Sequence, residues 1–279
     1  MATQKVLTTP PTTQDKLDAI ISGGGKVPAT LTQEDLGKDL PEKASDGHSS
    51  TETCYTCVTE RTPPQSSPAA IMIGLFQTIP RWKLGSVINF ATYAEGYPAP
   101  GDAIYAAKCL IQAAEIWNAE KVGVTFKWVP TIEDAAFVLG YGGLLDTVLA
   151  SAFFPSGKAL EHMYVYEYGF DKKKHTTSRG TFTNYGIMKN VFLHELGHVL
   201  GLRHEFAMDP ETFEGGAVVF GTPNKESVMS YKFPPELQKS DVEDTRSFYK
   251  YPLIVDYIPD NWGWMASPEK LRQRTLACN

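Results

Sequence analysis

Five residues near position 200 constrain the fold more than any other feature of the sequence. The run VFLHELGHVLGLRHE places His194, Glu195, His198, Gly201 and His204 in the order His-Glu-x-x-His-x-x-Gly-x-x-His. Residues four apart lie on one face of a helix, so the first two histidines can bind one ion at roughly 2.0–2.1 Å. Glycine adopts a positive φ angle without steric cost, which lets the helix end and the chain return the third histidine. The run therefore predicts a metal-binding helix followed by a sharp turn.

The metal site that these residues predict is open. Three protein ligands leave a fourth position for water, whereas structural zinc sites usually have four protein ligands. Zinc lowers the pKa of a bound water to about 7, and Glu195 lies close enough to take its proton. A single histidine on an apolar helix is more often a hydrogen-bonded core residue, but three of the six histidines fall in this one run. The pattern indicates one catalytic Zn²⁺.

The residues around the motif are apolar on nearly every side of the expected helix, which covers residues 187–200. This pattern is typical of a buried central helix, which would hold its ligands rigidly. The apolar positions are Ile187, Met188, Val191, Phe192, Leu193, Leu196, Val199 and Leu200.

With these residues placed, the chain resembles the metzincin clan of zinc metalloproteases, and Glu205 after the third histidine is astacin-like. The clan has a second motif, a turn with a methionine beneath the zinc, and the sequence SVMSY at residues 227–231 has that form. By resemblance, Met229 forms the floor of the site, and Tyr231 contacts the zinc or stabilises the oxyanion. The alternative for Tyr231 is an ordinary aromatic residue in a turn.

The resemblance implies a zinc-dependent endopeptidase in which Glu195 is the general base. Two alternatives stay open. One is a zinc-binding interaction protein without turnover, although such a site would not need Glu195. The other is a zinc hydrolase that acts on a small amide or ester.

Residues 149–155 look like the edge strand that lines the substrate cleft of matrix metalloproteases. An edge strand can bind an extended peptide because its outer N–H and C=O groups are unpaired. A polypeptide is therefore the expected substrate, and the candidate binding residues are Leu149, Ala150, Ser151 and Ala152. That family often has a histidine at the position of Ser151, bound to a second zinc. No replacement ligand set is evident, so we expect a single zinc.

The remaining pattern predicts an α+β fold with a mixed sheet, and the resemblance implies a metzincin-like domain with a twisted sheet of about five strands and three main helices. Asp102 can cap one helix, and a capping box at residues 240–243 predicts the last one, ending at Tyr249. Strands are expected at residues 87–92, 122–128, 136–141, 149–154 and 163–168. The resemblance spans roughly residues 82–251.

The first 68 residues are rich in Thr, Pro, Gly, Ser and charge and have little means of packing. We expect a flexible extension at residues 1–78, with one short helix near residues 14–21, then a catalytic domain at 79–255 and a docked tail at 256–279. The alternative is a propeptide that covers the zinc. Cys54 or Cys57 would then supply a thiolate, as in latent matrix metalloproteases, although the surrounding residues do not match that family's motif.

Composition excludes some partners. A net charge of −6 and a pI near 5.6 argue against nucleic acid or an anionic membrane surface. The longest apolar run, residues 69–76, is far shorter than the ~20 residues that cross a bilayer. We expect a monomer. The first residues lack the pattern of a secretory signal, although the family is mostly extracellular. We expect an intracellular protein or non-classical secretion, and the alternative is that the true N-terminus is missing.

Overall fold

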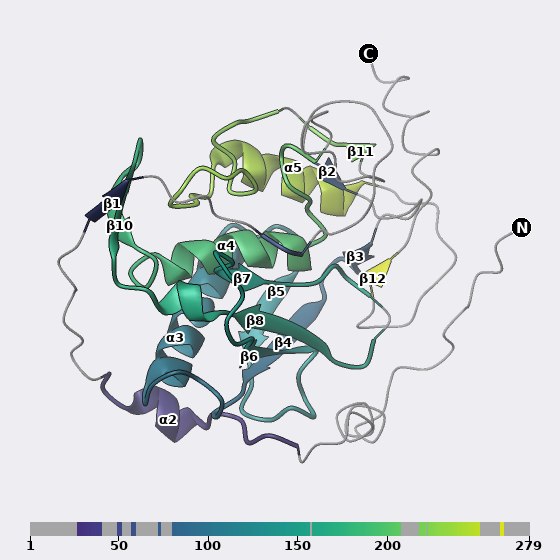
Figure 1. Cartoon of the computed structure of the whole chain (residues 1–279). Helices are drawn as coiled ribbons and strands as arrows, with labels where there is room; N and C mark the ends of the chain where they lie inside the picture. The colour runs from purple at the N-terminus through teal and green to yellow at the C-terminus, as the bar shows by residue number, and fades with distance from the viewer. Residues whose placement is uncertain are drawn as a thin grey trace, which may run out of the picture.

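The structure is a computed structural model. It describes residues 27–40, 49–51, 57–59, 72–73, 80–156, 158–207, 218–221, 223–251 and 263–264 (Figure 1). The short helix expected near residues 14–21 lies outside the described residues. No helix in the described ranges is long and apolar enough to cross a membrane.

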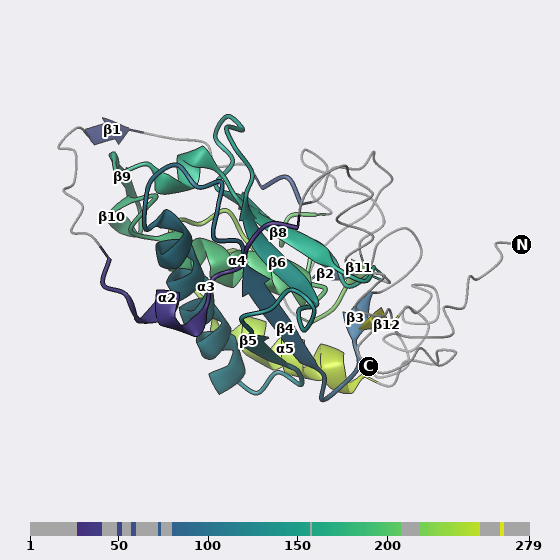
Figure 2. The same ribbon diagram turned by 90° about the horizontal axis from the view of Figure 1, so that it is seen from below.

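A five-stranded mixed sheet forms the centre of the fold, as the sequence predicts (Figure 2). Four of its strands are parallel, and the fifth runs antiparallel at one edge. The order across the sheet is β5 (Thr125–Trp128), β4 (Val87–Thr92), β6 (Phe137–Tyr141), β8 (Glu161–Val165) and β7 (Ala150–Ser151). The edge strand β7 is shorter than expected, because Ala150 and Ser151 pair with β8 and the N–H of Ala152 is directed to another partner.

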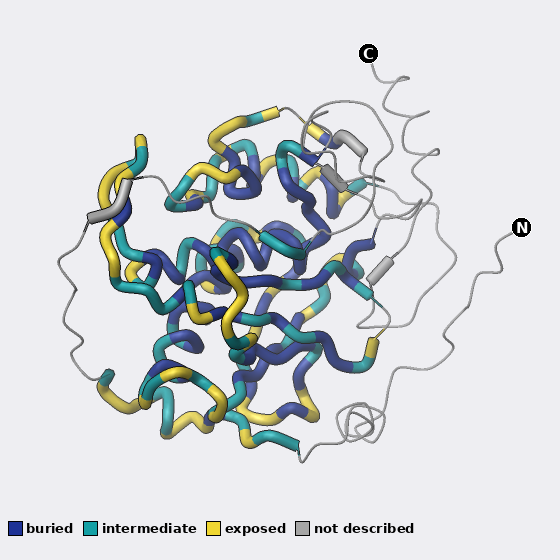
Figure 3. Tube along the Cα trace, in the orientation of Figure 1, coloured by how far each residue is buried: buried dark blue, intermediate teal, exposed yellow. Residues whose placement is uncertain are grey.

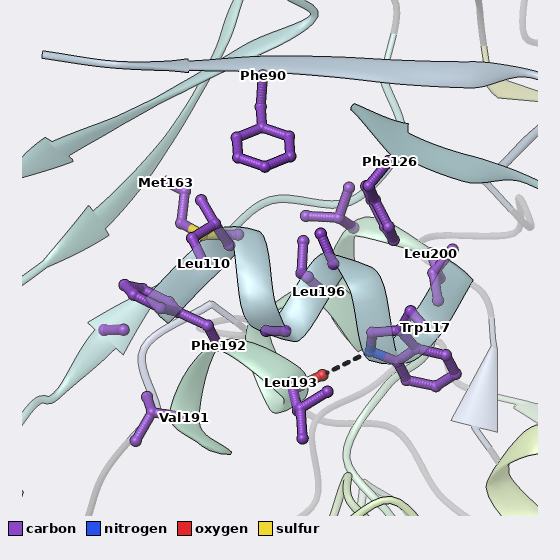
Figure 4. Close-up of a cluster of buried hydrophobic side chains, with 14 of the residues drawn as sticks. Phe90, Leu110, Trp117, Phe126, Met163, Val191, Phe192, Leu193, Leu196 and Leu200 are labelled. Atoms are coloured by element: carbon purple, nitrogen blue, oxygen red, sulfur yellow. Dashed lines mark hydrogen bonds between the residues drawn. The ribbon is translucent and has the colours of Figure 1, made fainter. Parts of the chain in front are cut away.

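Two long helices, α3 (Asp102–Ala119) and α4 (Met188–Val199), pack against each other on one face of the sheet. Side chains of β4 point alternately to the two faces of the sheet. Ile88 and Phe90 lie in the main core together with both helices, whereas Ala91 lies in a smaller cluster on the other face. Figure 4 shows Trp117 of α3 beside α4, with its indole N–H donating to the backbone oxygen of Leu193 at 3.0 Å.

Burial is deepest along α4 and the central strands (Figure 3). All but two of the residues of α4 are buried, which agrees with the central helix expected at residues 187–200. Two side chains hold the end of this helix: the Trp82 indole donates to the Val199 oxygen at 2.7 Å, and the Tyr249 hydroxyl donates to the Leu200 oxygen at 2.9 Å. The candidate metal ligands His194 and His198 are therefore carried on a buried helix whose end is held by side chains.

The other elements are small, apart from α5 (Lys239–Lys250), which contains Tyr249. A short helix, α2 (Gln33–Gly37), brings the described α-helices to four. A 3₁₀ turn, η1, spans Glu167–Phe170. Three minor sheets pair β1 (Ser49–Thr51) with β9 (Lys174–Thr177) and β10 (Gly180–Thr183), β2 (Met72–Ile73) with β11 (Val218–Val219), and β3 (Arg81–Trp82) with β12 (Gly263–Trp264).

The described part of the expected extension does pack. Leu31 is 3% exposed and lies in a cluster with Ala103 and Ala107 of α3, and its N–H donates to the Thr92 oxygen at 2.8 Å. The polar composition of residues 1–68 conceals this contact, because one buried leucine is enough to anchor a short segment. The domain boundaries expected at residues 78 and 255 stay predictions.

Both helix caps expected from the sequence are wrong in detail. The N-cap of α3 is Gly101, with φ +87°, and the carboxylate of Asp102 accepts the Ala99 N–H at 3.1 Å. Helix α5 begins at Lys239, earlier than the capping box at residues 240–243 implies. The capping box that the structure has lies two residues earlier, at residues 238–241: the carboxylate of Asp241, at the third helical position, accepts the Gln238 N–H at 2.8 Å.

Candidate metal centre

The structure brings the three motif histidines together. His194 and His198 lie on α4, and their ring centroids are 4.9 Å apart. The ring centroid of His204 lies 5.1 Å from that of His194 and 4.8 Å from that of His198. All three side chains are buried. Together with Cys57 they form a group whose ligand atoms all lie within 4.8 Å of one another, and this group could hold a metal ion.

The turn that returns His204 depends on Gly201, as predicted. Gly201 has φ +96°, in the left-handed region that favours glycine. A β-carbon at this position would overlap the backbone oxygen of Pro80. Two bonds close the end of the helix: the Gly201 N–H donates to the His198 oxygen at 2.8 Å, and the Leu202 N–H donates to the Gly197 oxygen at 2.9 Å.

Hydrogen bonds to the backbone fix which ring nitrogens face the centre. His194 Nδ1 lies 2.8 Å from the Val228 oxygen, and His198 Nδ1 lies 2.9 Å from the Leu202 oxygen. A carbonyl oxygen only accepts hydrogen bonds, so both Nδ1 atoms carry the proton and both Nε2 atoms keep a lone pair. His194 Nε2 lies 3.2 Å from His204 Nε2. A cation between these nitrogens would be bound by the lone pair of each, with His204 as the tautomer that carries its proton on Nδ1.

Burial keeps the three imidazoles neutral. It lowers the pKa of His194 to about 4, and it lowers the pKa values of His198 and His204 well below 6.5. The neighbouring histidines and Arg203 lower the pKa of His204 further. A neutral imidazole is the form that binds a metal ion, so the site favours the ligand state at neutral pH.

Glu195 lies beside the group without joining it. Its side chain is buried, at 2% exposed. Its Oε1 atom lies 3.7 Å from Cys57 Sγ, and its Oε2 atom accepts a hydrogen bond from the Thr59 hydroxyl at 3.2 Å. The carboxylate therefore faces the same side of the centre as the cysteine.

The methionine turn packs under α4. Met229 is buried, and its side chain fills the space beside Gly197, where a β-carbon would overlap the Met229 sulfur. The turn also orients a candidate ligand, because the Val228 oxygen accepts a hydrogen bond from His194 Nδ1. Asp241 of α5 holds the turn in position, because its carboxylate accepts the Val228 N–H at 2.8 Å. The turn and α5 thus act together as a floor for the centre.

Tyr231 lies next to the histidines. Its ring centroid is 5.1 Å from that of His204 and 6.4 Å from that of His194. The residue is 38% exposed, unlike the histidines. Its hydroxyl accepts the Cys57 N–H at 3.2 Å. The Tyr231 hydroxyl therefore lies on the side of the centre where Cys57 lies, and the residue is partly accessible to solvent.

A three-residue segment, residues 57–59, reaches the centre from the N-terminal part of the chain. Cys57 Sγ lies 3.6 Å from His198 Nε2. Of the two cysteines that the propeptide alternative proposes, Cys57 is the one in the group, and Cys54 lies outside the described residues. Sequence reasoning missed Thr59 entirely, since a threonine two residues after a cysteine carries no pattern of its own.

The candidate cleft strand lies beside the centre. Ala150 and Ser151 pair with β8, and the Leu149 oxygen accepts the Tyr166 N–H at 3.0 Å. The Ala152 N–H points to residues 57–59 and donates to the Thr59 hydroxyl at 2.9 Å. Two residues on, the Phe154 ring stands edge-on to His198, with ring centroids 5.5 Å apart. The strand and the candidate ligands therefore share one site.

No protein-family model and no curated protein matches this chain. The chemistry of the centre therefore follows from its own geometry. One thiol and three neutral imidazoles are ligands that suit borderline and soft transition metal ions, and the buried carboxylate beside them is a potential base.

Proposed function

We propose that this chain is a zinc-dependent metalloendopeptidase with a metzincin-type catalytic domain. The arrangement of His194, His198 and His204 around one point, with Glu195 beside it, carries the proposal. Three neutral nitrogens can hold the ion, and the carboxylate remains available as a base. Zinc-dependent hydrolysis of a peptide bond uses both parts in one site.

Two separations between candidate ligand atoms match those of a zinc site, within a group whose ligand atoms all lie within 4.8 Å of one another. Nitrogens about 2.0–2.1 Å from a tetrahedral Zn²⁺ lie about 3.3–3.4 Å apart, and a sulfur at about 2.3 Å lies about 3.6 Å from such a nitrogen. The two Nε2 atoms of His194 and His204 are 3.2 Å apart, and Cys57 Sγ is 3.6 Å from His198 Nε2. The donor set is also the mixture of imidazole and thiolate that zinc prefers.

Each nearby residue has a role in this mechanism. Zinc held by the histidines would act as a Lewis acid and lower the pKa of the attacking water. Glu195 takes the proton of that water and passes it to the leaving amine. The Tyr231 hydroxyl donates a hydrogen bond to the oxyanion, and losing one such donor typically raises the barrier by about 3–4 kcal/mol. Met229 packs below the ligands and keeps them in place.

The edge strand supports a polypeptide substrate. The Ala152 N–H is directed out of the sheet, toward the region of the candidate ligands, and it already donates to an oxygen from another segment. A carbonyl of an extended peptide can take the same hydrogen bond. A small amide or ester would make no use of this strand.

Cys57 favours a second candidate function. A site with one cysteine and three histidines has four protein ligands, which is typical of structural zinc. The chain would then be a zinc-binding interaction protein without turnover. Glu195 counts against this function, because a structural site gains nothing from a buried carboxylate that is not a ligand.

The variant Glu195→Gln tests the proposal. Zinc content and peptide cleavage are measured for four proteins: the intact chain, Cys57→Ala, Glu195→Gln and the double variant. We expect Glu195→Gln to retain zinc and to reduce cleavage of a quenched peptide library by roughly 10²–10⁴-fold. The matched control is Glu236→Gln, at an exposed position away from the centre, which keeps the parent rate. Normal turnover in Glu195→Gln, or no cleavage by any of these chains, overturns the proposal.

A further inference from the structure

Arg179 occupies the turn of the hairpin that β9 and β10 form at one edge of the molecule (Figure 1). A long cation in a hairpin turn is usually solvated, because its charge is costly to bury. The side chain of Arg179 is instead only 11% exposed. All four N–H groups of its two terminal nitrogens donate hydrogen bonds within 3.2 Å. The hairpin therefore holds this guanidinium against another segment of the chain.

The acceptors of these hydrogen bonds lie on both sides of the methionine turn. One terminal nitrogen donates to the backbone oxygens of Lys232, at 3.2 Å, and Pro234, at 2.7 Å. The other donates to the backbone oxygen of Glu226 at 3.0 Å and to its carboxylate at 2.8 Å. The turn itself, residues 227–231, lies between these acceptors in the sequence. One guanidinium thus joins the two ends of the turn.

We propose that Arg179 is a positioning residue for Tyr231: it closes the methionine turn, so that the Tyr231 hydroxyl stays beside the candidate metal centre. This inference rests on the proposed function, in which that hydroxyl stabilises the oxyanion. In this role Arg179 contacts neither the metal nor the substrate, and it acts through the backbone that follows Tyr231.

The first half of the turn has supports of its own. The Asp241 carboxylate accepts the Val228 N–H at 2.8 Å, and the Met229 oxygen accepts the Glu205 N–H at 3.1 Å. Val228 and Met229 are also both buried. The oxygen that orients His194 belongs to Val228, so loss of the guanidinium should leave the candidate metal ligands in place.

The second half of the turn depends on the hairpin. Tyr231 is 38% exposed, and its ring stands edge-on to Phe206, with ring centroids 4.5 Å apart. Beyond it, the Thr177 hydroxyl of β9 donates to the Phe233 oxygen at 2.6 Å. The same hydroxyl oxygen accepts the Arg179 N–H at 3.2 Å, so these two hairpin residues support each other. The hairpin therefore fixes the path of the chain where it leaves Tyr231.

The forked shape of arginine is what suits these acceptors. A guanidinium presents its N–H groups in a rigid plane, whereas a lysine has one ammonium on a flexible stem. A single ammonium can bind one end of the turn but cannot bridge both. The variant Arg179→Lys therefore keeps the charge and removes the closure.

Steady-state peptide cleavage tests the inference. Arg179→Gln, Arg179→Lys, Tyr231→Phe and the double variant Arg179→Gln/Tyr231→Phe are each made in the intact chain and in Cys57→Ala. Arg179→Gln should lower kcat and kcat/KM equally, by about tenfold or more, with zinc content unchanged. Arg179→Lys should lose as much. In the double variant, kcat should match that of Tyr231→Phe alone, because the hydroxyl that Arg179 positions is already gone.

The matched control is Arg246→Gln. Arg246 also binds the backbone oxygen and the carboxylate of one glutamate, Glu120, but it joins α5 to the end of α3. This variant should keep the parent kcat. Losses that multiply in the double variant, or a parent kcat in Arg179→Lys, overturn the proposal.

Amide hydrogen exchange reports the closure of the turn without turnover. The Ser230 N–H donates to the Ser227 oxygen at 3.0 Å, and the Lys232 N–H donates to the Ser230 hydroxyl oxygen at 3.3 Å. In Arg179→Gln these amides should exchange about tenfold faster or more, whereas those of α4 should not change. If exchange rises but no chain cleaves peptides, the protease is wrong and the closure stands. If the chains cleave and Arg179→Gln matches its parent in both measurements, the protease stands and the positioning role is wrong.

Discussion

Gly197 of helix α4 and Met229 of the turn below it are packed with no space between them, so that a β-carbon on Gly197 would overlap the Met229 sulfur. We predict that Gly197→Ala destabilises the fold by about 1–3 kcal/mol, because added volume in a filled core forces its neighbours apart. Helix propensity alone would make this variant more stable by about 1 kcal/mol, because alanine favours a helix over glycine. A loss of stability would therefore show that the overlap with Met229 outweighs the helix propensity. Urea unfolding measures the change.

The double variant with Met229→Ala identifies the cause. Met229→Ala alone should destabilise by about 2–5 kcal/mol through the cavity it leaves. In the double variant, the new β-carbon enters that cavity. The loss of unfolding free energy in the double variant should therefore be smaller than the sum of the losses in the two single variants, by about 0.5–3 kcal/mol. Simple additivity would show that the two residues do not compete for the same space.

Local patterns predicted much of the fold, because they act between residues near in sequence. Strand β4 was expected at residues 87–92 and is found at Val87–Thr92, since apolar side chains in its run alternate between two buried faces. The histidine run likewise specifies helix α4 through the spacing of four between His194 and His198. Periodicity of this kind depends only on backbone geometry.

Contacts between distant segments could not be predicted in the same way. Thr59 contacts Glu195, 136 residues away, and nothing in either local sequence encodes the pairing. Over a shorter separation of 13 residues, the sequence also does not encode that the Asp241 carboxylate accepts the Val228 N–H while it caps α5. Cys57 could be suggested as a ligand from its chemistry, but only the fold selects its position beside His198.

Gly201 is predicted to be less tolerant of a side chain than a glycine with a similar backbone. Gly201 and Gly143 have φ angles of +96° and +81°, so alanine at either costs about 1–2 kcal/mol in backbone strain. Only at Gly201 would the added β-carbon also overlap a backbone atom, the Pro80 oxygen; at Gly143 nothing lies within 4 Å. We expect Gly201→Ala to reduce the unfolding free energy clearly more than Gly143→Ala, measured in urea. It should also weaken zinc binding, because the same turn positions His204. Equal effects of the two variants would contradict this explanation.

Asp241 is predicted to tune the metal site from a distance. Asp241→Ala removes the acceptor of two backbone N–H groups, those of Val228 and Gln238, which should destabilise the fold by about 2–4 kcal/mol. Because the Val228 oxygen orients His194, zinc affinity should fall roughly 10–100-fold, measured by chelator competition. The matched control is Asp134→Ala, whose carboxylate accepts from the exposed Thr131 hydroxyl. A loss of stability with unchanged zinc affinity would mean that the turn does not position the ligand.

Cys109 predicts how stability depends on alkaline pH. Burial in α3 raises the pKa of its thiol to about 11, whereas the unfolded chain releases this proton near the ordinary thiol pKa of 9.0. Between those values the unfolded state binds fewer protons than the folded state, so stability falls as pH rises from about 9 to about 11. The full contribution of the neutral thiol is present below pH 9. A difference of this size between the folded and unfolded pKa values corresponds to about 2–3 kcal/mol at most.

The variant Cys109→Ala isolates this contribution from the tyrosines that titrate in the same range. The unfolding free energies of the intact chain and of Cys109→Ala are measured in urea at pH 8 and at pH 11. Cys109→Ala loses packing at both pH values. Between pH 8 and pH 11 its unfolding free energy should decline less than that of the intact chain, and the two declines should differ by about 2–3 kcal/mol at most. Equal declines would show that the Cys109 thiol ionises in the folded protein as easily as in the unfolded chain, which its burial in the main core argues against.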